Sequence, residues 1–244
     1  MKSSGNIGAF FDLDGTLLPP PSLELRFIFY LLTRGLIGRV QFASYAGGFL
    51  SRMAENTRTE VKANKAYFSG VSASSAQNWS KRFESRPLKF FSAGLRRLAF
   101  HFSQGHHIFL ITGAPAPLAQ LITKYFPAPL TIVATQLVAR HGCWTGEIAG
   151  DHICGAAKQR AIVHLAEVHC LDLARSFAYG NSLSDLRMLE TVAYPAAVNP
   201  SNRLNRLARR RAWPTLRWRE SQAGLPEINE TPKPFHCCTE FSSR

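Results

Sequence analysis

Acidic residues are scarce in this chain of 244 residues, and their scarcity leaves a strong positive charge. Lys and Arg together number 29 against 16 Asp and Glu, so the formal net charge is +13 at pH 7. Seven arginines lie within the single segment 203–219. A basic surface attracts phosphate esters, acidic lipid headgroups and nucleic acid alike. The composition therefore favours an anionic substrate or partner.

Long apolar runs are also missing. The longest one near the N-terminus, 27–32, is bounded by Arg26 and Arg34, whereas a membrane span needs roughly 20 apolar residues. The first seven residues hold one lysine and lead straight into a strand-like segment, which leaves no room for a secretory signal. We therefore expect a cytoplasmic protein without a transmembrane segment.

The cysteines show no spacing that would indicate pairing or metal binding. The count of five is odd and no C-x-x-C spacing occurs, which speaks against both a disulfide framework and a zinc site. We expect reduced thiols at all five positions, which are Cys143, Cys154, Cys170, Cys237 and Cys238.

Apolar runs of strand length alternate with helical patterns over most of the chain, and this alternation is typical of a parallel sheet covered by helices. The expected strands are 7–13, 107–111, 130–135, 176–179 and 192–198. Helices are expected between them at 116–126, 156–168 and 183–191. The pattern predicts a doubly wound, Rossmann-like α/β fold with a parallel sheet of about five strands.

The segment 19–87 has no strand pattern, and its apolar residues recur at helical spacing. We expect an inserted helical cap here. A polar, proline-rich stretch without periodicity ends the chain. The predicted division is an α/β core at 1–18 and 88–220, a helical cap at 19–87 and a flexible tail at 221–244.

The first helix of the predicted cap is expected at 23–34, with Ser22 as its N-cap and Gly35 at its end. This helix is apolar nearly all round. Such a helix fits burial within a small bundle, or contact with a lipid or an apolar substrate.

The first predicted strand ends in the run Asp12-Leu13-Asp14-Gly15-Thr16. In an extended strand residues i and i+2 point the same way, so the carboxylates of Asp12 and Asp14 would meet at the carboxyl edge of the sheet, where open α/β sheets bind ligands. Two adjacent acids repel unless a cation or a shared proton relieves them, and Mg²⁺ prefers carboxylate and carbonyl oxygens. The pattern indicates a magnesium site in which one acid attacks phosphorus while the other moves a proton. An Asp-rich turn is the plainer alternative.

Three further motifs follow later strands or open later helices. Thr112 and Gly113 offer a hydroxyl and backbone N–H groups at a helix start, which suit an anion or an ordinary N-cap. Lys158 lies at the start of a predicted helix, where the helix dipole disfavours a positive charge. Either an anionic partner or solvation of the side chain would explain a lysine there. Asn181 and Asp185 offer an amide oxygen and a carboxylate at another strand end.

In their order and spacing these four motifs resemble those of the haloacid-dehalogenase superfamily, in its phosphoserine-phosphatase-like branch with a helical cap. The FFDLDGTL start, the approach 178–180, the continuation 186–190 and the closing Ala-Val-Asn-Pro200 look like bacterial subfamily IB hydrolases. The resemblance covers about residues 7–219.

The resemblance implies a Mg²⁺-dependent phosphatase that acts on a phosphate monoester. Asp12 would be the nucleophile and form an aspartyl-phosphate, and Asp14 would be the acid and base. Thr112, with the neighbouring Gly113, would bind the phosphoryl oxygens, and Lys158 would offset the charge of nucleophile and phosphate. The implied metal-binding residues are Asp12, Asp14, Asn181 and Asp185, the last as a direct ligand or as a holder of metal-bound water.

The chain departs from the family pattern at two points. Asn181 stands where the family usually has a magnesium-binding Asp; its amide oxygen can still coordinate, but metal affinity should fall. Pro21 aligns with the acid that phosphoserine phosphatases use for the substrate amine, and Glu24 is nearby but displaced. A less polar alcohol than serine therefore fits better, as in a lysophospholipid. The expected substrate is a small phosphorylated metabolite or a lipid-headgroup phosphate.

The remaining signals concern partners. Arg203–Arg219 could contact an acidic membrane surface, whereas nucleic acid is not favoured because no aromatic residues interleave with the arginine helix at 203–211. The alternative function is a catalytically weakened protein of the same fold that binds anions or acidic lipids. The histidines around the second strand, His101, His106 and His107, are expected in loops and on the surface and not in a metal cluster.

Overall fold

A computed structural model describes residues 5–38, 65–126 and 129–219. Its centre is a sheet with strand order β4-β3-β2-β1-β5-β6-β7. The strands are β1 (Gly8–Phe11), β2 (His107–Pro115), β3 (Thr131–Arg140), β4 (Cys143–Ala149), β5 (Phe177–Gly180), β6 (Tyr194–Val198) and β7 (Thr215–Leu216). All neighbouring pairs are parallel except β3 and β4.

The predicted α/β class with a parallel sheet is confirmed, but the expected number of about five strands is wrong, since the sheet has seven. The five expected strands correspond to β1, β2, β3, β5 and β6. The antiparallel β4 was missed because Thr145 and Glu147 interrupt its apolar pattern, and of its seven residues Trp144 and Gly146 alone are buried. The two residues of β7 are too few to form a pattern.

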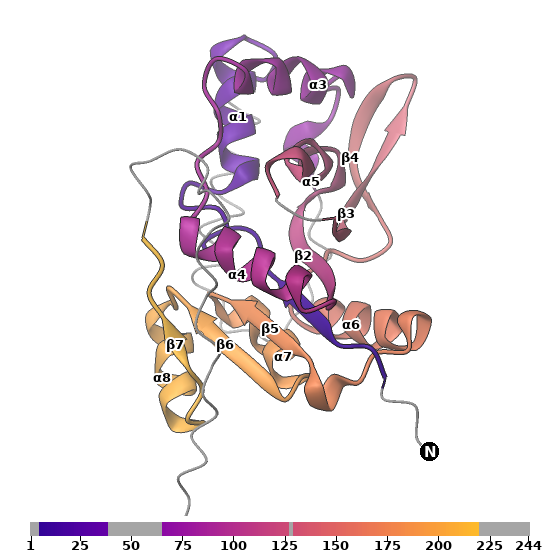
Figure 1. Cartoon of the computed structure of the whole chain (residues 1–244). Coiled ribbons are helices and arrows are strands. Elements are labelled where there is room, and N and C mark those ends of the chain that lie inside the picture. The colour runs from indigo at the N-terminus through magenta and orange to yellow at the C-terminus, as the bar shows by residue number, and fades with distance from the viewer. Residues whose placement is uncertain (1–4, 39–64, 127–128, 220–244) are drawn as a thin grey trace, which may run out of the picture.

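Helices connect and cover the strands (Figure 1). The α-helices are α1 (Leu23–Thr33), α3 (Ser74–Ser80), α4 (Ser92–Ser103), α5 (Ala116–Leu121), α6 (Ala156–His169), α7 (Leu186–Glu190) and α8 (Asn202–Arg210). The 3₁₀ turns are η1 (Ala66–Phe68), η2 (Lys81–Phe83), η3 (Thr123–Tyr125), η4 (Leu173–Arg175) and η5 (Leu183–Asp185). The three helices expected between strands are found as α5 with η3, as α6, and as η5 with α7.

The two faces of the sheet are buried under different helices. Phe10 on β1 packs in a cluster with residues of α6, α7 and α8, while its neighbour Phe11 packs in a cluster that includes Leu95 and Leu98 of α4. Successive side chains of a strand point to opposite faces of the sheet, and both faces are buried here. The sequence of β1 is therefore a continuous apolar run. With both faces covered, the strand ends become the accessible part of the sheet.

The described parts of 19–87 are helical, and Figure 1 shows α1 and α3 grouped beyond one end of the sheet. An aromatic cluster built on Phe27, Phe68, Trp79 and Trp144 joins these helices to β4. The boundaries of the cap and core stay a prediction. Part of the predicted cap, 39–64, and the predicted tail, 221–244, lie outside the described residues.

Helix α1 begins and ends close to where the sequence indicated. The Ser22 hydroxyl oxygen accepts a hydrogen bond from the N–H of Leu25 at 3.3 Å, and Gly35 follows the last turn with φ +66°. Phe27, at the middle of the helix, is fully buried. Leu23, Ile28, Tyr30 and Leu31 are buried as well, whereas Phe29 is 48% exposed, so most but not all of the apolar side chains of α1 serve burial inside the protein.

The arginine-rich helix α8 docks on the sheet through one side. Leu204 and Ala208 are fully buried, whereas Arg203, Arg206 and Arg209 are exposed. In the ranges given above, no helix combines the length and apolarity that crossing a membrane requires. The three described cysteines form no disulfide.

One of the histidines expected on the surface is buried, so that prediction is wrong for His101. Its Nε2 lies 2.8 Å from the Tyr179 hydroxyl, and its Nδ1 lies 2.8 Å from Nδ1 of His106. Burial lowers the pKa of the His101 imidazole to about 3, and the charges of His106 and Arg97 act in the same direction. A polar histidine is expected at the surface, but these two hydrogen bonds allow the His101 ring to be buried in the core.

This burial predicts a specific loss of stability in acid. An unfolded histidine has a pKa near 6.5, so between about pH 6.5 and 3 the unfolded chain binds a proton that the folded protein excludes. His101→Gln should be less stable at pH 7, yet lose about 2 kcal/mol less of its unfolding free energy than the wild type between pH 7 and pH 5. Urea unfolding at both pH values measures this. Equal losses in the two proteins would contradict it, and exposed His164→Gln should behave like the wild type.

Candidate active site

Asp12 directly follows the central strand β1. Its N–H donates to the carbonyl oxygen of Tyr179 on β5 at 2.9 Å, and the rings of Phe11 and Tyr179 stack with centroids 4.6 Å apart. Gly15 has φ +84°, which lets the chain turn immediately after Asp14. Strand pairing and ring stacking thus hold the start of the predicted catalytic turn.

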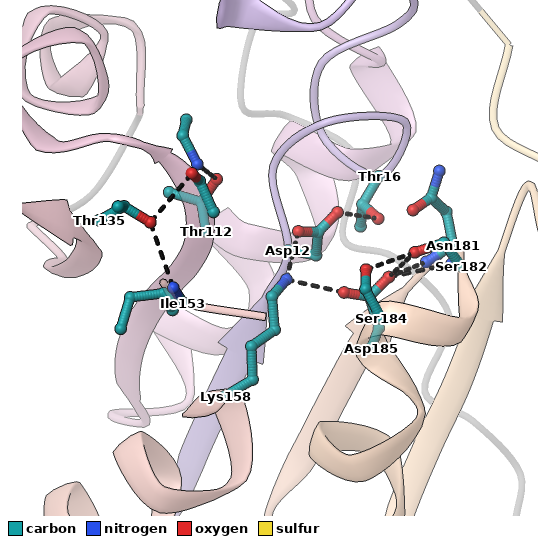
Figure 2. A network of polar contacts seen from close by, with 12 residues as sticks. Asp12, Thr16, Thr112, Thr135, Ile153, Lys158, Asn181, Ser182, Ser184 and Asp185 are labelled. Atoms are coloured by element: carbon teal, nitrogen blue, oxygen red, sulfur yellow. Dashed lines mark hydrogen bonds and ion pairs between the residues drawn. The ribbon is translucent and has the colours of Figure 1, made fainter. Parts of the chain in front are cut away.

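Lys158, in the first turn of α6, lies between two carboxylates (Figure 2). Its Nζ is 2.5 Å from Oδ1 of Asp12 and 2.7 Å from Oδ1 of Asp185, and all three side chains are buried. Burial alone would lower the pKa of Lys158, but the charges of the two carboxylates outweigh it and hold the pKa above its ordinary value. The ammonium group therefore stays charged and joins α6 to the ends of β1 and β5.

Both carboxylate oxygens of Asp12 have a donor. Oδ1 accepts from Lys158, and Oδ2 accepts from the fully buried hydroxyl of Thr16 at 3.0 Å. Burial, reinforced by the charge of Asp185 and opposed by Lys158, raises the pKa of Asp12 to about 7. Cations close to this carboxylate would favour its ionised, nucleophilic form. Thr16 was not among the predicted site residues.

Asp14 is held by the start of the helix that follows it. Its Oδ1 accepts a hydrogen bond from the N–H of Leu23 at 2.7 Å. Burial raises the pKa of Asp14 to about 6; the Leu23 hydrogen bond acts against this rise and the charge of Glu24 adds to it. A carboxyl group with such a pKa can both donate and accept a proton near neutral pH.

Asp185 uses both oxygens to hold its own loop. Oδ1 accepts from Lys158, while Oδ2 accepts from the N–H of Asn181 at 3.0 Å, the N–H of Ser182 at 2.9 Å and the hydroxyl of Ser182 at 3.0 Å. Because four donors already surround this carboxylate, it fits the role of organising the loop better than that of a direct metal ligand.

Thr112 and Gly113 lie in the last part of β2, next to the end of β1, since the register pairs Phe11 with Leu110. The expectation that they stand at a helix start is wrong, because β2 continues to Pro115 and α5 begins at Ala116. The buried Thr112 hydroxyl accepts from the N–H of Ala114 at 3.1 Å, which leaves its own proton for another acceptor. Figure 2 shows Thr112 apart from the Lys158 cluster, and it makes no hydrogen bond to that cluster within the described structure. The helix after it, α5, has only six residues.

Thr135, which the sequence analysis did not single out, supports this loop from β3. Its hydroxyl donates to the carbonyl oxygen of Gly113 at 3.0 Å and accepts from the N–H of Ile153 at 3.2 Å. An isolated threonine in a strand carries no signal of such a role. Its two bonds tie the end of β2 to the segment that precedes α6 (Figure 2).

The Asn181 side chain lies against the turn at Gly15, because a Cβ at Gly15 would fall 1.9 Å from its Nδ2. The amide is therefore beside the Asp14-Gly15 turn, with the Asp12 carboxylate on the same edge. A carboxylate, a backbone carbonyl and an amide oxygen form a donor set suited to Mg²⁺. Within the described residues no group of three or more His, Cys, Asp or Glu could hold a metal ion.

The structure brings Asp12, Lys158 and Asp185 into direct contact, and joins Asn181 to them through the Asp185 loop. Asp14 lies beside the cluster, and its negative charge contributes to the raised pKa of Asp12. Thr112 lies at the neighbouring strand end. The contact between Lys158 and Asp12 joins residues 146 positions apart in the chain. The chemical roles of all these residues stay predictions.

Known proteins are similar to this chain over most of its length. A protein named for inhibition of morphological differentiation in Streptomyces azureus is 28% identical over 239 residues, covering 93% of this chain and 84% of that protein. A probable phosphatase of Mycobacterium tuberculosis is 29% identical over 216 residues, covering 85% and 74%.

Solved structures share the fold. A protein of unknown function from Bordetella pertussis superposes with TM-score 0.73 at 24% identity, covering 88% of this chain and 99% of that one. A probable phosphoserine phosphatase of Vibrio cholerae gives TM-score 0.63 at 13% identity, covering 87% and 61%. The family model for haloacid dehalogenase-like hydrolases matches residues 9–190, which contain the four motifs and the strands β2, β3, β4 and β5, so the chain belongs to that family.

Proposed function

We propose that this protein is a Mg²⁺-dependent phosphatase that hydrolyses a phosphate monoester through a phosphorylated Asp12. The observation that carries the proposal is the buried contact of Asp12 with Lys158, beside an Asp14 whose carboxyl group can exchange a proton near neutral pH. Membership of a hydrolase family and the names of phosphatases among the relatives support it.

In the first step a carboxylate oxygen of Asp12 attacks phosphorus and the bond from phosphorus to the ester oxygen breaks. The leaving oxygen takes the proton of Asp14. Lys158 would offset negative charge on the phosphoryl oxygens and the Thr112 hydroxyl would donate a hydrogen bond to one of them, and such stabilisation is the main catalytic demand of phosphoryl transfer.

In the second step Asp14, now ionised, accepts a proton from water as that water attacks the phosphorus of the aspartyl-phosphate. The bond between phosphorus and the Asp12 oxygen breaks, which releases phosphate and restores the carboxylate. One group can serve both steps because the pKa of Asp14 lies close to neutral pH.

Asp12, the backbone carbonyl of Asp14 and Asn181 would hold Mg²⁺. When bound, the ion supplies positive charge that favours ionised Asp12 and offsets the charge of the phosphoryl group. Asp185 keeps the Asn181 loop in place through its hydrogen bonds to Asn181 and Ser182.

The substrate proposed is a small phosphorylated metabolite or a lipid-headgroup phosphate whose leaving alcohol carries no amine. Glu24 of α1 is the acid that could bind a substrate amine. The buried Lys65 ammonium already lies 2.7 Å from each carboxylate oxygen of Glu24, and the Tyr67 hydroxyl also donates to this carboxylate. A substrate amine would have to displace these donors. This closed contact supports an uncharged leaving group.

The exposed arginines of α8 support the further proposal of an acidic membrane surface as a partner. The alternative of a weakened protein that only binds anions is less favoured, since Asp12, Asp14 and Lys158 are all retained and relatives are named as phosphatases. A cytoplasmic location stays a prediction.

Asp12→Asn should abolish hydrolysis of p-nitrophenyl phosphate in the presence of Mg²⁺, because an amide cannot form the aspartyl-phosphate. Asp14→Asn should reduce the rate by on the order of 10²- to 10⁴-fold through loss of the proton donor. Steady-state kinetics of the purified proteins measure both effects. Glu167→Gln, an exposed change on α6, is the matched control, and equal rates for the wild type and Asp12→Asn would end the proposal.

Asn181→Asp should lower the Mg²⁺ concentration needed for half-maximal activity, because a carboxylate attracts the cation more strongly than an amide. Gln104→Glu adds the same charge at the end of α4 and should leave the requirement unchanged. Titration of activity with Mg²⁺ gives both values. An unchanged requirement in Asn181→Asp would remove this residue from the metal site.

Replacing Arg203, Arg206 and Arg209 by Gln should weaken binding to phosphatidylserine vesicles by roughly 100-fold, since each such cation contributes about 1 kcal/mol at an anionic surface. Cosedimentation with vesicles measures the affinity, and vesicles of phosphatidylcholine alone serve as the control. If the wild type does not bind phosphatidylserine vesicles, the membrane proposal is wrong.

A further inference from the structure

The backbone of Asn181 is held on two sides. Its N–H donates to Oδ2 of Asp185 at 3.0 Å (Figure 2), and its carbonyl oxygen accepts from the N–H of Ser201 at 2.8 Å. The first contact lies within the loop after β5, whereas the second comes from the loop after the neighbouring strand β6. Both peptide groups that flank the Asn181 Cα atom are therefore fixed, and with them the direction in which the side chain leaves the backbone.

This direction matters more for an amide than for a carboxylate. An amide oxygen carries no net charge, so it contributes to cation binding only where it points at the ion, and Mg²⁺ demands nearly ideal octahedral geometry. The Asn181 side chain already lies against the turn at Gly15, where an added Cβ would fall 1.9 Å from Nδ2. A site that uses Asn181 thus depends on what holds the backbone of this residue.

Asn199 fixes the loop that supplies the Ser201 N–H. Its Nδ2 donates to the carbonyl oxygen of Trp218 at 2.9 Å, and its Oδ1 accepts from the N–H of Trp218 at 2.9 Å. Its own N–H donates to the carbonyl oxygen of Leu216 on β7 at 2.8 Å. The backbone of Asn199 has φ +41°, in the left-handed region that asparagine adopts more readily than most residues. These three hydrogen bonds join the loop after β6 to the segment that begins at β7.

Trp218 anchors that segment to the core. Its side chain is buried, and its ring centroid lies 6.1 Å from that of Tyr179 on β5. On its other side a Cβ at Gly94 would lie 2.9 Å from Cζ3 of the indole, so the ring packs directly on the backbone of α4. The peptide groups that Asn199 binds are therefore fixed by burial of the indole between β5 and α4.

We propose that Asn199 and Trp218 are positioning residues for Asn181, which hold the loop at Ser201 and thereby keep the Asn181 amide oxygen available to Mg²⁺. The inference rests on the proposed function, and within it on Asn181 as a Mg²⁺-binding residue. Both positioning residues lie beyond residues 9–190, which the family model matches, and outside the four motifs.

The first test measures Mg²⁺ binding to the full chain by isothermal titration calorimetry, with the metal alone and no substrate. Asn199→Gly accepts the positive φ but offers no partner to Trp218. It should weaken Mg²⁺ binding roughly tenfold, the lower end of the effect expected for residues that hold a metal ligand in place. Asn78→Gly, an exposed change on α3, is the matched control and should keep the wild-type dissociation constant. Circular dichroism establishes that each variant is folded at the temperature used.

A second pair of variants reaches the same loop through Trp218. Trp218→Leu removes the aromatic ring from between Tyr179 and Gly94 and should weaken Mg²⁺ binding in the same direction as Asn199→Gly. Trp218→Phe keeps a ring there and should restore binding towards the wild type. If Asn199→Gly does not fold, Trp218→Leu decides alone: weaker binding supports the proposal, and wild-type binding contradicts it.

A double variant tests whether the effect acts through Asn181. Asn181→Ala removes the amide oxygen and should itself weaken Mg²⁺ binding, but it leaves the backbone contacts in place. In this background Asn199→Gly should have no further effect on the dissociation constant. A merely structural role would instead lower the melting temperature and leave Mg²⁺ binding at the wild-type value. Equal weakening with and without the Asn181 side chain would also overturn the proposal.

The outcomes separate this inference from the proposed function. If the wild type hydrolyses p-nitrophenyl phosphate and Asn181→Ala weakens Mg²⁺ binding, while Asn199→Gly and Trp218→Leu bind Mg²⁺ like the wild type, the positioning role is refuted and the phosphatase stands. If Asn181→Ala leaves Mg²⁺ binding unchanged, the inference is refuted together with the metal-binding role of Asn181, and hydrolysis through Asp12 is not. If the wild type neither binds Mg²⁺ nor hydrolyses the substrate, both are refuted.

Discussion

The site depends on one buried ammonium group shared by two carboxylates. Lys158 makes ionic hydrogen bonds to Asp12 and Asp185, which belong to different strand ends. Removing one partner from such a buried group typically costs about 3–5 kcal/mol, because a charge is left without compensation. The three residues therefore hold each other in place, and with them the turn after β1, the first turn of α6 and the loop after β5.

Parallel topology explains why these residues can meet. Strand β1 lies between β2 and β5, so the chain segments that leave these three strands emerge at the same edge. Helices bury both faces of the sheet, which leaves the strand ends as the place where polar groups can face a ligand. The first amide of α1 donates to Asp14, so the region predicted as a cap directly contacts the residue proposed as acid and base.

Much of this arrangement could be predicted from the sequence. Apolar strands followed by Asp12, Thr112 and Asn181 indicate that these residues lie at one edge of the sheet. The carboxyl ends of parallel strands meet at the same edge, and ligands bind there. The closeness of Lys158 to Asp12 is what the resemblance of the motifs implies, whereas the contact of Lys158 with Asp185 was not predicted. What could not be predicted depends on contacts across the fold: Thr16 and Thr135 act through hydrogen bonds of their hydroxyl groups, and His101 is placed by Tyr179, 78 residues away. β4 was missed because a half-solvated hairpin lacks a continuous apolar run.

The central claim is that Asp12 takes up the phosphoryl group, and a direct measurement can test it. Asp14→Asn should slow the release of phosphate from the enzyme, so acid quenching after mixing with substrate and Mg²⁺ should trap the covalent intermediate. Mass spectrometry of the digested protein should then find one phosphoryl group on the peptide that contains Asp12. A peptide that stays unmodified while substrate is still hydrolysed would contradict the account.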